Sequence, residues 1–127
     1  MTHENSSIIR PLSEREKELL FWLSTHPTSD VHIPGNEIDD LSIAAECGCG
    51  CASVDFAIGG EPISQENGIT IVADYLYKSS EQNQMGCFLF LSNGHLGGIE
   101  VWSVDGAETP KNLPAPQELY SYEQAQR

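Results

Sequence analysis

The chain has 127 residues with 19 acidic and 6 basic side chains, which give it a formal net charge of −13 at pH 7. The length suits one domain of ordinary size, and an apolar fraction of 39% together with 11 glycines is enough for a hydrophobic core. Because affinity for a phosphate backbone or an anionic membrane comes from Lys and Arg, this charge argues against nucleic acid and membranes as partners.

The first expected element is a helix over residues 13–25, which follows a loose leader over residues 1–11. Ser13 and Glu16 have the spacing of a capping box, in which each side chain accepts a hydrogen bond from the backbone amide of the other. A His-Pro pair ends the helical pattern after residue 25. The apolar residues that recur near the helical period, and that we expect to pack on a sheet, are Leu19, Leu20 and Leu23.

After about residue 40 the sequence has the pattern of short β-strands. Alternating apolar residues indicate half-buried strands, and two longer runs are rich in β-branched and aromatic residues. Asn93-Gly94 is the strongest short hairpin signal in the chain. The expected strands cover residues 41–45, 54–58, 69–77, 87–91 and 99–104.

A two-residue turn at Asn93-Gly94 also predicts the register of that hairpin. It places Ser92 opposite His95, Leu91 opposite Leu96, Phe90 opposite Gly97, and Phe88 opposite Ile99.

Several prolines after Glu108 predict an extended tail over residues 107–127. With the leader and this tail set apart, residues 12–106 form the expected core of a single domain. We predict an α+β fold, in which one N-terminal helix packs on a mostly antiparallel sheet of four to five strands.

The segment from Cys47 to Ser53 contains three cysteines and two glycines, and it interrupts the strand pattern. Apolar residues fall on odd positions before this segment and on even positions after it. Because side chains alternate along a strand, one unbroken strand cannot hold both sets on one face. A bulge, bend or turn is therefore expected between about residues 47 and 53, where Gly48 and Gly50 permit it.

This cysteine cluster admits several interpretations. Reduced cysteines can serve as small buried apolar residues, or they can bind a soft ion such as zinc or Cu(I). The candidate ligands are Cys47, Cys49, Cys51, Cys87 and His95. A reactive thiol is disfavoured because no Lys or Arg lies nearby in the sequence to stabilise a thiolate. A dinucleotide-binding loop is excluded because no helix follows the glycines.

The spacing of the first three cysteines is too short for ordinary disulfide geometry, which favours a reducing cytoplasm. The sequence also lacks a secretory signal pattern and any run of about 18 apolar residues. His95 lies beside the hairpin turn and is interpreted first as a polar turn residue. No catalytic motif is present, so we expect a protein that is not an enzyme.

The Cys47–Phe56 and Asn93–Val101 segments resemble small bacterial proteins of uncharacterised function. Those proteins share a Cys-x-Cys-Gly-Cys strand motif and a C-terminal Asx-Gly hairpin, and the resemblance covers residues 12–118. It implies the same helix-and-sheet architecture and supplies no activity. It also implies that Glu100 belongs with the cysteines to one shared feature.

The positive charges of the chain are unevenly placed, because every charged residue between Lys17 and Lys78 is acidic. A solvated acidic surface explains this pattern, and so does a docking face for a basic protein. The sequence therefore leaves three functions open. The first is an acidic binding protein, such as an inhibitor or immunity-type protein, with homodimerisation an open question. The second is a soft-metal protein that uses the cysteine cluster, and the third, which the absence of catalytic motifs disfavours, is a small enzyme that uses Cys51 or His95.

Overall fold

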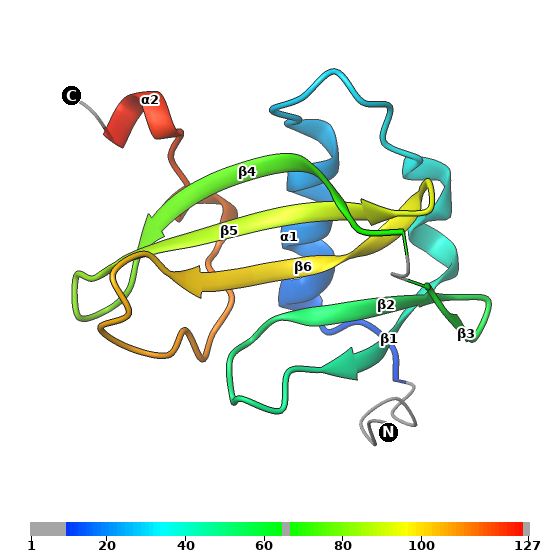
Figure 1. The fold of residues 1–127 in the computed structure, drawn as a ribbon, viewed down its shortest axis with the longest axis horizontal. Helices are drawn as coiled ribbons and strands as arrows, with labels where there is room; N and C mark the ends of the chain where they lie inside the picture. The colour runs from blue at the N-terminus through cyan, green and yellow to red at the C-terminus, as the bar shows by residue number, and fades with distance from the viewer. Residues whose placement is uncertain (1–9, 65–66, 126–127) are drawn as a thin grey trace.

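The computed structural model describes residues 10–64 and 67–125 (Figure 1). One main helix, two 3-10 turns, a short C-terminal helix and six strands follow one another along the chain. They are α1 (Glu14–Thr25), η2 (Gly35–Asp40), β1 (Leu41–Glu46), β2 (Val54–Ile58), β3 (Glu61–Pro62), β4 (Thr70–Lys78), β5 (Gln84–Ser92), β6 (His95–Ser103), η3 (Pro116–Glu118) and α2 (Tyr122–Ala125).

All six strands belong to one antiparallel sheet in the order β1-β2-β6-β5-β4, and β3 pairs with the outer part of β2. The β1–β2 pair and the β4–β5–β6 strands meet where β2 pairs with β6, through Val54↔Ile99 and Asp55↔Gly98. The α+β prediction is confirmed, and the two-residue β3 accounts for the strand beyond the four to five that were expected. No helix within the described ranges is long and apolar enough to cross a membrane.

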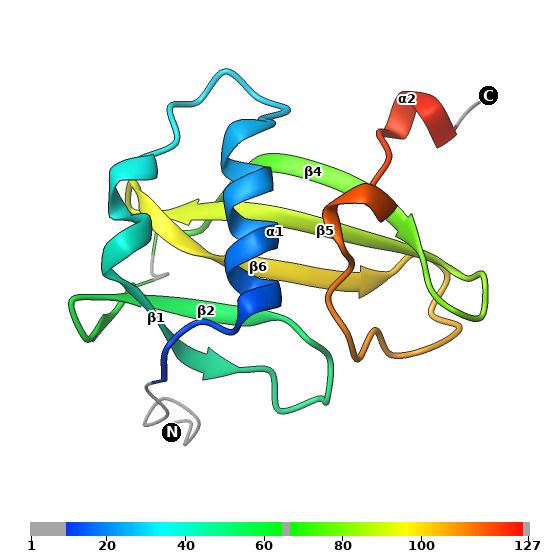
Figure 2. The same cartoon turned by 180° about the vertical axis from the view of Figure 1, so that it is seen from behind.

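Helix α1 begins and packs as its sequence predicts. The Ser13 side chain accepts a hydrogen bond from the Glu16 amide at 3.2 Å, and the Glu16 carboxylate accepts one from the Ser13 amide at 2.7 Å. The helix lies across one face of the sheet (Figure 2). Its leucine stripe is fully buried against that face, at Leu19, Leu20 and Leu23.

Alternation along the central strands separates a helix-covered face from an open face. On β5, the side chains of Met85, Cys87 and Leu89 are fully buried beneath α1. Phe88, between two of them, points to the opposite face, which Figure 1 views directly with α1 behind the sheet. The sheet thus has one face that packs against α1 and one face that no helix of the described chain covers.

The predicted register of the β5–β6 hairpin is right only near the turn. Ser92↔His95 and Leu91↔Leu96 are paired as expected, but the register then shifts by one residue. Phe90 therefore faces Gly98 rather than Gly97. A Cβ on either glycine would lie less than 3.0 Å from the Phe90 ring, so the aromatic ring occupies the space that two side chains would otherwise fill.

The segment after Gly106 packs on the helix-covered face beside α1 (Figure 2). Leu113 and Ala115 are buried, and the backbones of Tyr120 and Leu76 exchange two hydrogen bonds of 2.9 Å at the edge of β4. We call residues 107–121 the C-terminal strap. It corresponds to most of the predicted extended tail, and the predicted leader over residues 1–11 lies almost wholly outside the described residues.

Candidate metal centre

Residues 47–53 form the connection between β1 and β2, and we call them the cysteine loop. The Gly50 amide donates to the Cys47 carbonyl at 3.3 Å, which closes a turn, and Gly50 has φ +95°. That conformation favours glycine because it has no Cβ. Apolar residues therefore change from odd positions in β1 to even positions in β2 because a turn separates the two strands. A turn was one of the three structures expected here, beside a bulge and a bend.

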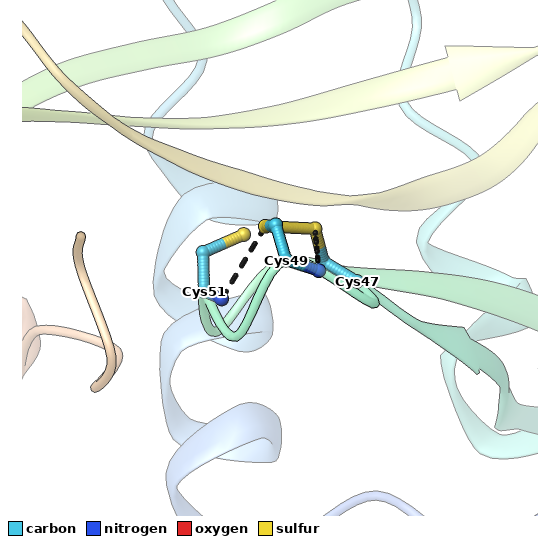
Figure 3. A group of neighbouring side chains, drawn as sticks. All are labelled: Cys47, Cys49 and Cys51. Carbon is cyan, nitrogen blue, oxygen red and sulfur yellow. Dashed lines mark hydrogen bonds between the residues drawn. A yellow bond between two sulfur atoms is a disulfide. The ribbon is translucent and has the colours of Figure 1, made fainter.

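The turn brings three sulfur atoms together (Figure 3). The Sγ atoms of Cys47, Cys49 and Cys51 all lie within 4.8 Å of one another. Cys47 and Cys49 are joined by a disulfide, with their Cα atoms 5.3 Å apart, and Cys51 is a free thiol.

The disulfide corrects the expectation that these cysteines are too close in sequence to pair. The turn places the two Cα atoms at a separation that is normal for disulfides, although only one residue lies between them. Cysteine spacing therefore no longer supports a reducing compartment, and a cytoplasmic location stays a prediction.

Cys87 and His95, the other two candidate ligands, are not part of this cluster. Cys87 is fully buried on the helix-covered face of β5, where burial and the nearby charge of Asp74 raise the pKa of its thiol to about 12. His95 lies at the start of β6, and its Nδ1 atom is 2.6 Å from a carboxylate oxygen of Glu37. Glu37 also accepts the Leu96 amide at 2.9 Å, so this contact ties η2 to the hairpin.

The β2 end of the cysteine loop is fixed to the rest of the protein. On its β2 side, the Ser53 hydroxyl accepts the Val101 amide at 2.9 Å and donates to the Val101 carbonyl at 3.2 Å. The Ala52 amide donates to the Pro110 carbonyl of the C-terminal strap at 2.9 Å. The loop is therefore held between β6 and the strap, which positions Cys51 without blocking it.

The cysteine loop forms one wall of a pocket of about 670 Å³, and three basic and two acidic side chains also line it. Arg10 comes from the segment before α1, Arg15 from the first turn of α1, and Lys111 from the C-terminal strap. The sequence disfavours a reactive thiol because no Lys or Arg lies near the cysteines along the chain. The fold overturns that premise, because it places these three cations in the same pocket wall as Cys47 and Cys51.

Arg10 is the best fixed of the three cations. Its Nη1 and Nη2 atoms donate to the two carboxylate oxygens of Glu16, each at 2.9 Å, and its Nε donates to Glu46 at 2.9 Å. Burial would raise the pKa of Glu16, but the hydrogen bonds from Arg10 and Ser13 outweigh it and lower that pKa. Arg10 thus offsets one of the two acidic charges of the pocket wall, and Arg15 and Lys111 make the net charge of the wall positive.

Glu100 lies half-buried on the open face of β6, not in the pocket wall. Burial and the charge of Asp55 raise the pKa of Glu100, whereas a hydrogen bond with Ser53 lowers it. Ser53 therefore links Glu100 to the end of the cysteine loop. The resemblance that groups Glu100 with the cysteines stays a prediction.

Comparison with known proteins found no matching protein-family model, no matching curated protein and no matching solved structure.

Proposed function

We propose that the protein binds one soft metal ion, of the zinc or Cu(I) class, through Cys47, Cys49 and Cys51 in their reduced state. The observation that carries this proposal is the convergence of the three Sγ atoms within 4.8 Å. Three thiolates at about 2.3 Å from one ion lie roughly 3.8–4.0 Å apart in tetrahedral or trigonal geometry. Binding therefore requires reduction of the disulfide and small rotations of the cysteine side chains.

Charge also supports this assignment. Three thiolates bound to one such ion leave a net negative centre, and Arg15 and Lys111 in the same pocket offset it. The net charge of −13 favours the approach of a cation from solution. Three sulfur ligands alone suit a soft ion, whereas zinc completes its usual four-coordinate set with a further donor such as water.

Metal titration of the reduced protein tests the proposal. With Zn²⁺ and Cu(I) titrated separately against a chromophoric chelator, we expect one ion per chain for at least one of the two metals. Cys51→Ser removes one of three ligands and is expected to weaken binding at least tenfold. Cys87→Ala and His95→Asn are the matched controls, because each removes a candidate donor that lies outside the cluster.

Two results would contradict a three-cysteine metal site. One is binding of less than about a tenth of an equivalent of either metal by the fully reduced protein. The other is a loss of affinity in Cys87→Ala or His95→Asn equal to that in Cys51→Ser.

We propose, as a second function, docking of a basic protein on the open face of the sheet. Phe88 is the centre of this face, and its cross-strand neighbours are Asp74 on β4 and Glu100 on β6. Trp102 lies two pairs further along and therefore on the same face, with its ring over Gly86. Aromatic faces flanked by carboxylates suit Lys and Arg side chains, which gain both cation–π and ionic contacts.

The half-buried carboxylates distinguish this face from the rest of the acidic surface. Burial raises the pKa of Asp74, although Tyr122 donates to it at 3.3 Å, and burial and Asp55 raise that of Glu100. Partly desolvated carboxylates gain more from a cationic partner than fully hydrated ones, because water screens them less.

Binding of a hexa-arginine peptide at several salt concentrations tests the second function. We expect the double variant Asp74→Asn/Glu100→Gln to bind at least tenfold more weakly than the unmodified protein. Glu14→Gln/Glu18→Gln makes the same change in net charge on α1 and is expected to weaken binding by less than about threefold. Equal losses in the two double variants would show general charge attraction and refute a docking site on this face.

A further inference from the structure

The oxidised cysteine loop has a chemistry that metal binding does not use. In this structure a disulfide joins Cys47, which lines a pocket of about 670 Å³, to Cys49, which does not line it. Cys49 is exposed and Cys47 is half-buried, so a solution molecule reaches the Cys49 sulfur more easily. A disulfide that can be reached by small molecules is open to thiol–disulfide exchange.

The wall of this pocket differs in charge from the rest of the molecule. It carries three positive side chains, Arg10, Arg15 and Lys111, and two negative ones, Glu16 and Glu46. Its net charge is therefore positive in a chain whose overall charge is −13. Basic residues that gather at one place in such an acidic protein favour an anionic molecule there.

Two of the three cations are available to such a molecule. The guanidinium of Arg10 is held by Glu16 and Glu46. Arg15 contacts Glu18 at 3.3 Å and donates to the Leu113 carbonyl at 3.2 Å, and 47% of its side-chain surface stays exposed. Lys111 is exposed, and it makes no hydrogen bond or ion pair with any other residue of the described chain. Carboxylates are natural partners for both side chains.

We propose that the Cys47–Cys49 disulfide is a thiol–disulfide exchange site for a small thiol that bears carboxylates, which Arg15 and Lys111 bind. A pocket of this volume falls in the range typical of small-molecule sites and accommodates a ligand of tripeptide size. The inference does not rest on metal binding, because it concerns the oxidised, metal-free protein.

The exchange proceeds in two balanced steps. First, the thiolate of the substrate attacks the Sγ of Cys49, a bond forms between these sulfurs, and the Cys47–Cys49 bond breaks. The electron pair moves to the Sγ of Cys47, which takes up the proton that the substrate thiol released. A second substrate thiolate then attacks the sulfur of the first, which frees Cys49 as a thiol. Two substrate thiols are thereby oxidised to one disulfide, and the protein disulfide is reduced to two thiols.

Backbone amides support Cys47 as the leaving group. The Cys49 amide donates to the Cys47 Sγ at 3.3 Å, and this contact stabilises negative charge that develops on that sulfur when the bond breaks. The corresponding contact at Cys49, from the Cys51 amide, is 3.4 Å long. Both sulfurs therefore accept one backbone amide, and the greater exposure of Cys49 assigns attack to it.

The test measures the rate at which different thiols reduce the oxidised protein in the presence of a metal chelator. Glutathione supplies a thiol with two carboxylates, and β-mercaptoethanol supplies an uncharged one. In Arg15→Ala/Lys111→Ala we expect the rate with glutathione to fall about tenfold, because the cations that bind its carboxylates are gone. The rate with β-mercaptoethanol should change by less than about twofold in that variant.

Lys17→Ala is the matched control, because Lys17 is a basic residue of the same helix that does not line the pocket. It should leave both rates within about twofold of those of the unmodified protein. Equal slowing of both thiols in the double variant, or the same slowing of glutathione in Lys17→Ala, would overturn the proposal. These measurements use the oxidised protein and the metal titrations use the reduced one, so either proposal can fail without the other.

Discussion

The four cysteines of this chain differ in chemistry because the fold gives each a different environment. Cys87 is fully buried and has a raised thiol pKa of about 12, so it is protonated and shielded. Cys51 is half-buried at the edge of a pocket, and Cys47 and Cys49 share a disulfide. Reactivity thus follows position in the fold rather than residue type.

Alkylation with N-ethylmaleimide, followed by mass spectrometry, measures how many of the four cysteines are accessible thiols in each state of the protein. The folded protein without reductant should add one label, at Cys51, and after gentle reduction it should add three. The fourth label, at Cys87, should appear only in denaturant, because the buried thiol is neither ionised nor accessible. Two labels before reduction would contradict the assignment of the disulfide.

The ion pair between Arg10 and Glu16 stabilises a buried carboxylate. Glu16 is only 6% exposed and relies on Arg10 and Ser13 to stabilise its charge. Arg10→Ala leaves this carboxylate without its cation, and we expect it to lower the free energy of unfolding at pH 7 by roughly 1–3 kcal/mol. Urea unfolding measures this loss.

Acid pH should reduce the difference between Arg10→Ala and the unmodified protein. Because the folded pKa of Glu16 is lowered, the pair stabilises the protein above the ordinary pKa of a glutamate, and this contribution is lost as pH falls through the lowered folded value. Lys17→Ala is the control, since its 3.8 Å contact with Glu14 is fully at the surface and should contribute less than about 0.5 kcal/mol. A difference that stays constant down to pH 2 would contradict this account.

Among the elements, α1 could be predicted almost to the residue and β6 could not. The helix depends on local signals, because its capping box and leucine stripe are read within 13 consecutive residues. The register of β6 depends on a contact between strands, in which the Phe90 ring takes the space over Gly97 and Gly98. The Asn-Gly turn fixes only the first pairs, and no local pattern reveals where a ring will lie.

The glycine at position 98 is expected to be essential for this packing. A Cβ there would overlap the Val54 carbonyl oxygen and lie 2.7 Å from the Phe90 ring, at the only place where β2 pairs with β6 among the described residues. Gly98→Ala should therefore lower the free energy of unfolding by roughly 1–3 kcal/mol, as urea denaturation would measure. Gly35→Ala is the control, because nothing lies within 4 Å of its added Cβ. Equal stability of the two variants would show that β6 can shift freely.

At the scale of the whole molecule, the fold joins parts of the chain that the sequence keeps apart. Arg15 and Lys111 line one pocket although they are far apart in the sequence, and the sequence places no basic residue near the cysteines. The three-cysteine cluster could be predicted because its members are adjacent in the chain. Its cationic surroundings could not, because they depend on the path of the C-terminal strap.

The C-terminal strap should therefore be required both for stability and for the pocket. A chain that ends at Gly106 loses the buried side chains of Leu113 and Ala115 and the hydrogen bond that holds Ala52. We expect this truncation to lower the free energy of unfolding by more than about 3 kcal/mol, a large part of the stability of a domain this size. Thermal and urea unfolding measure the loss.

A second truncation, after Ser121, separates the strap from the short helix that follows it. This chain keeps the Leu76–Tyr120 pairing and loses α2, including the Tyr122 hydrogen bond to Asp74. Because that contact is exposed and 3.3 Å long, its removal should cost less than about 1 kcal/mol. If the two truncated chains were equally stable, the strap would contribute nothing to the stability of the core. If only the chain that ends at Gly106 unfolds readily, the strap is part of the core. The position of the cysteine loop then depends on a segment more than 50 residues further along the chain.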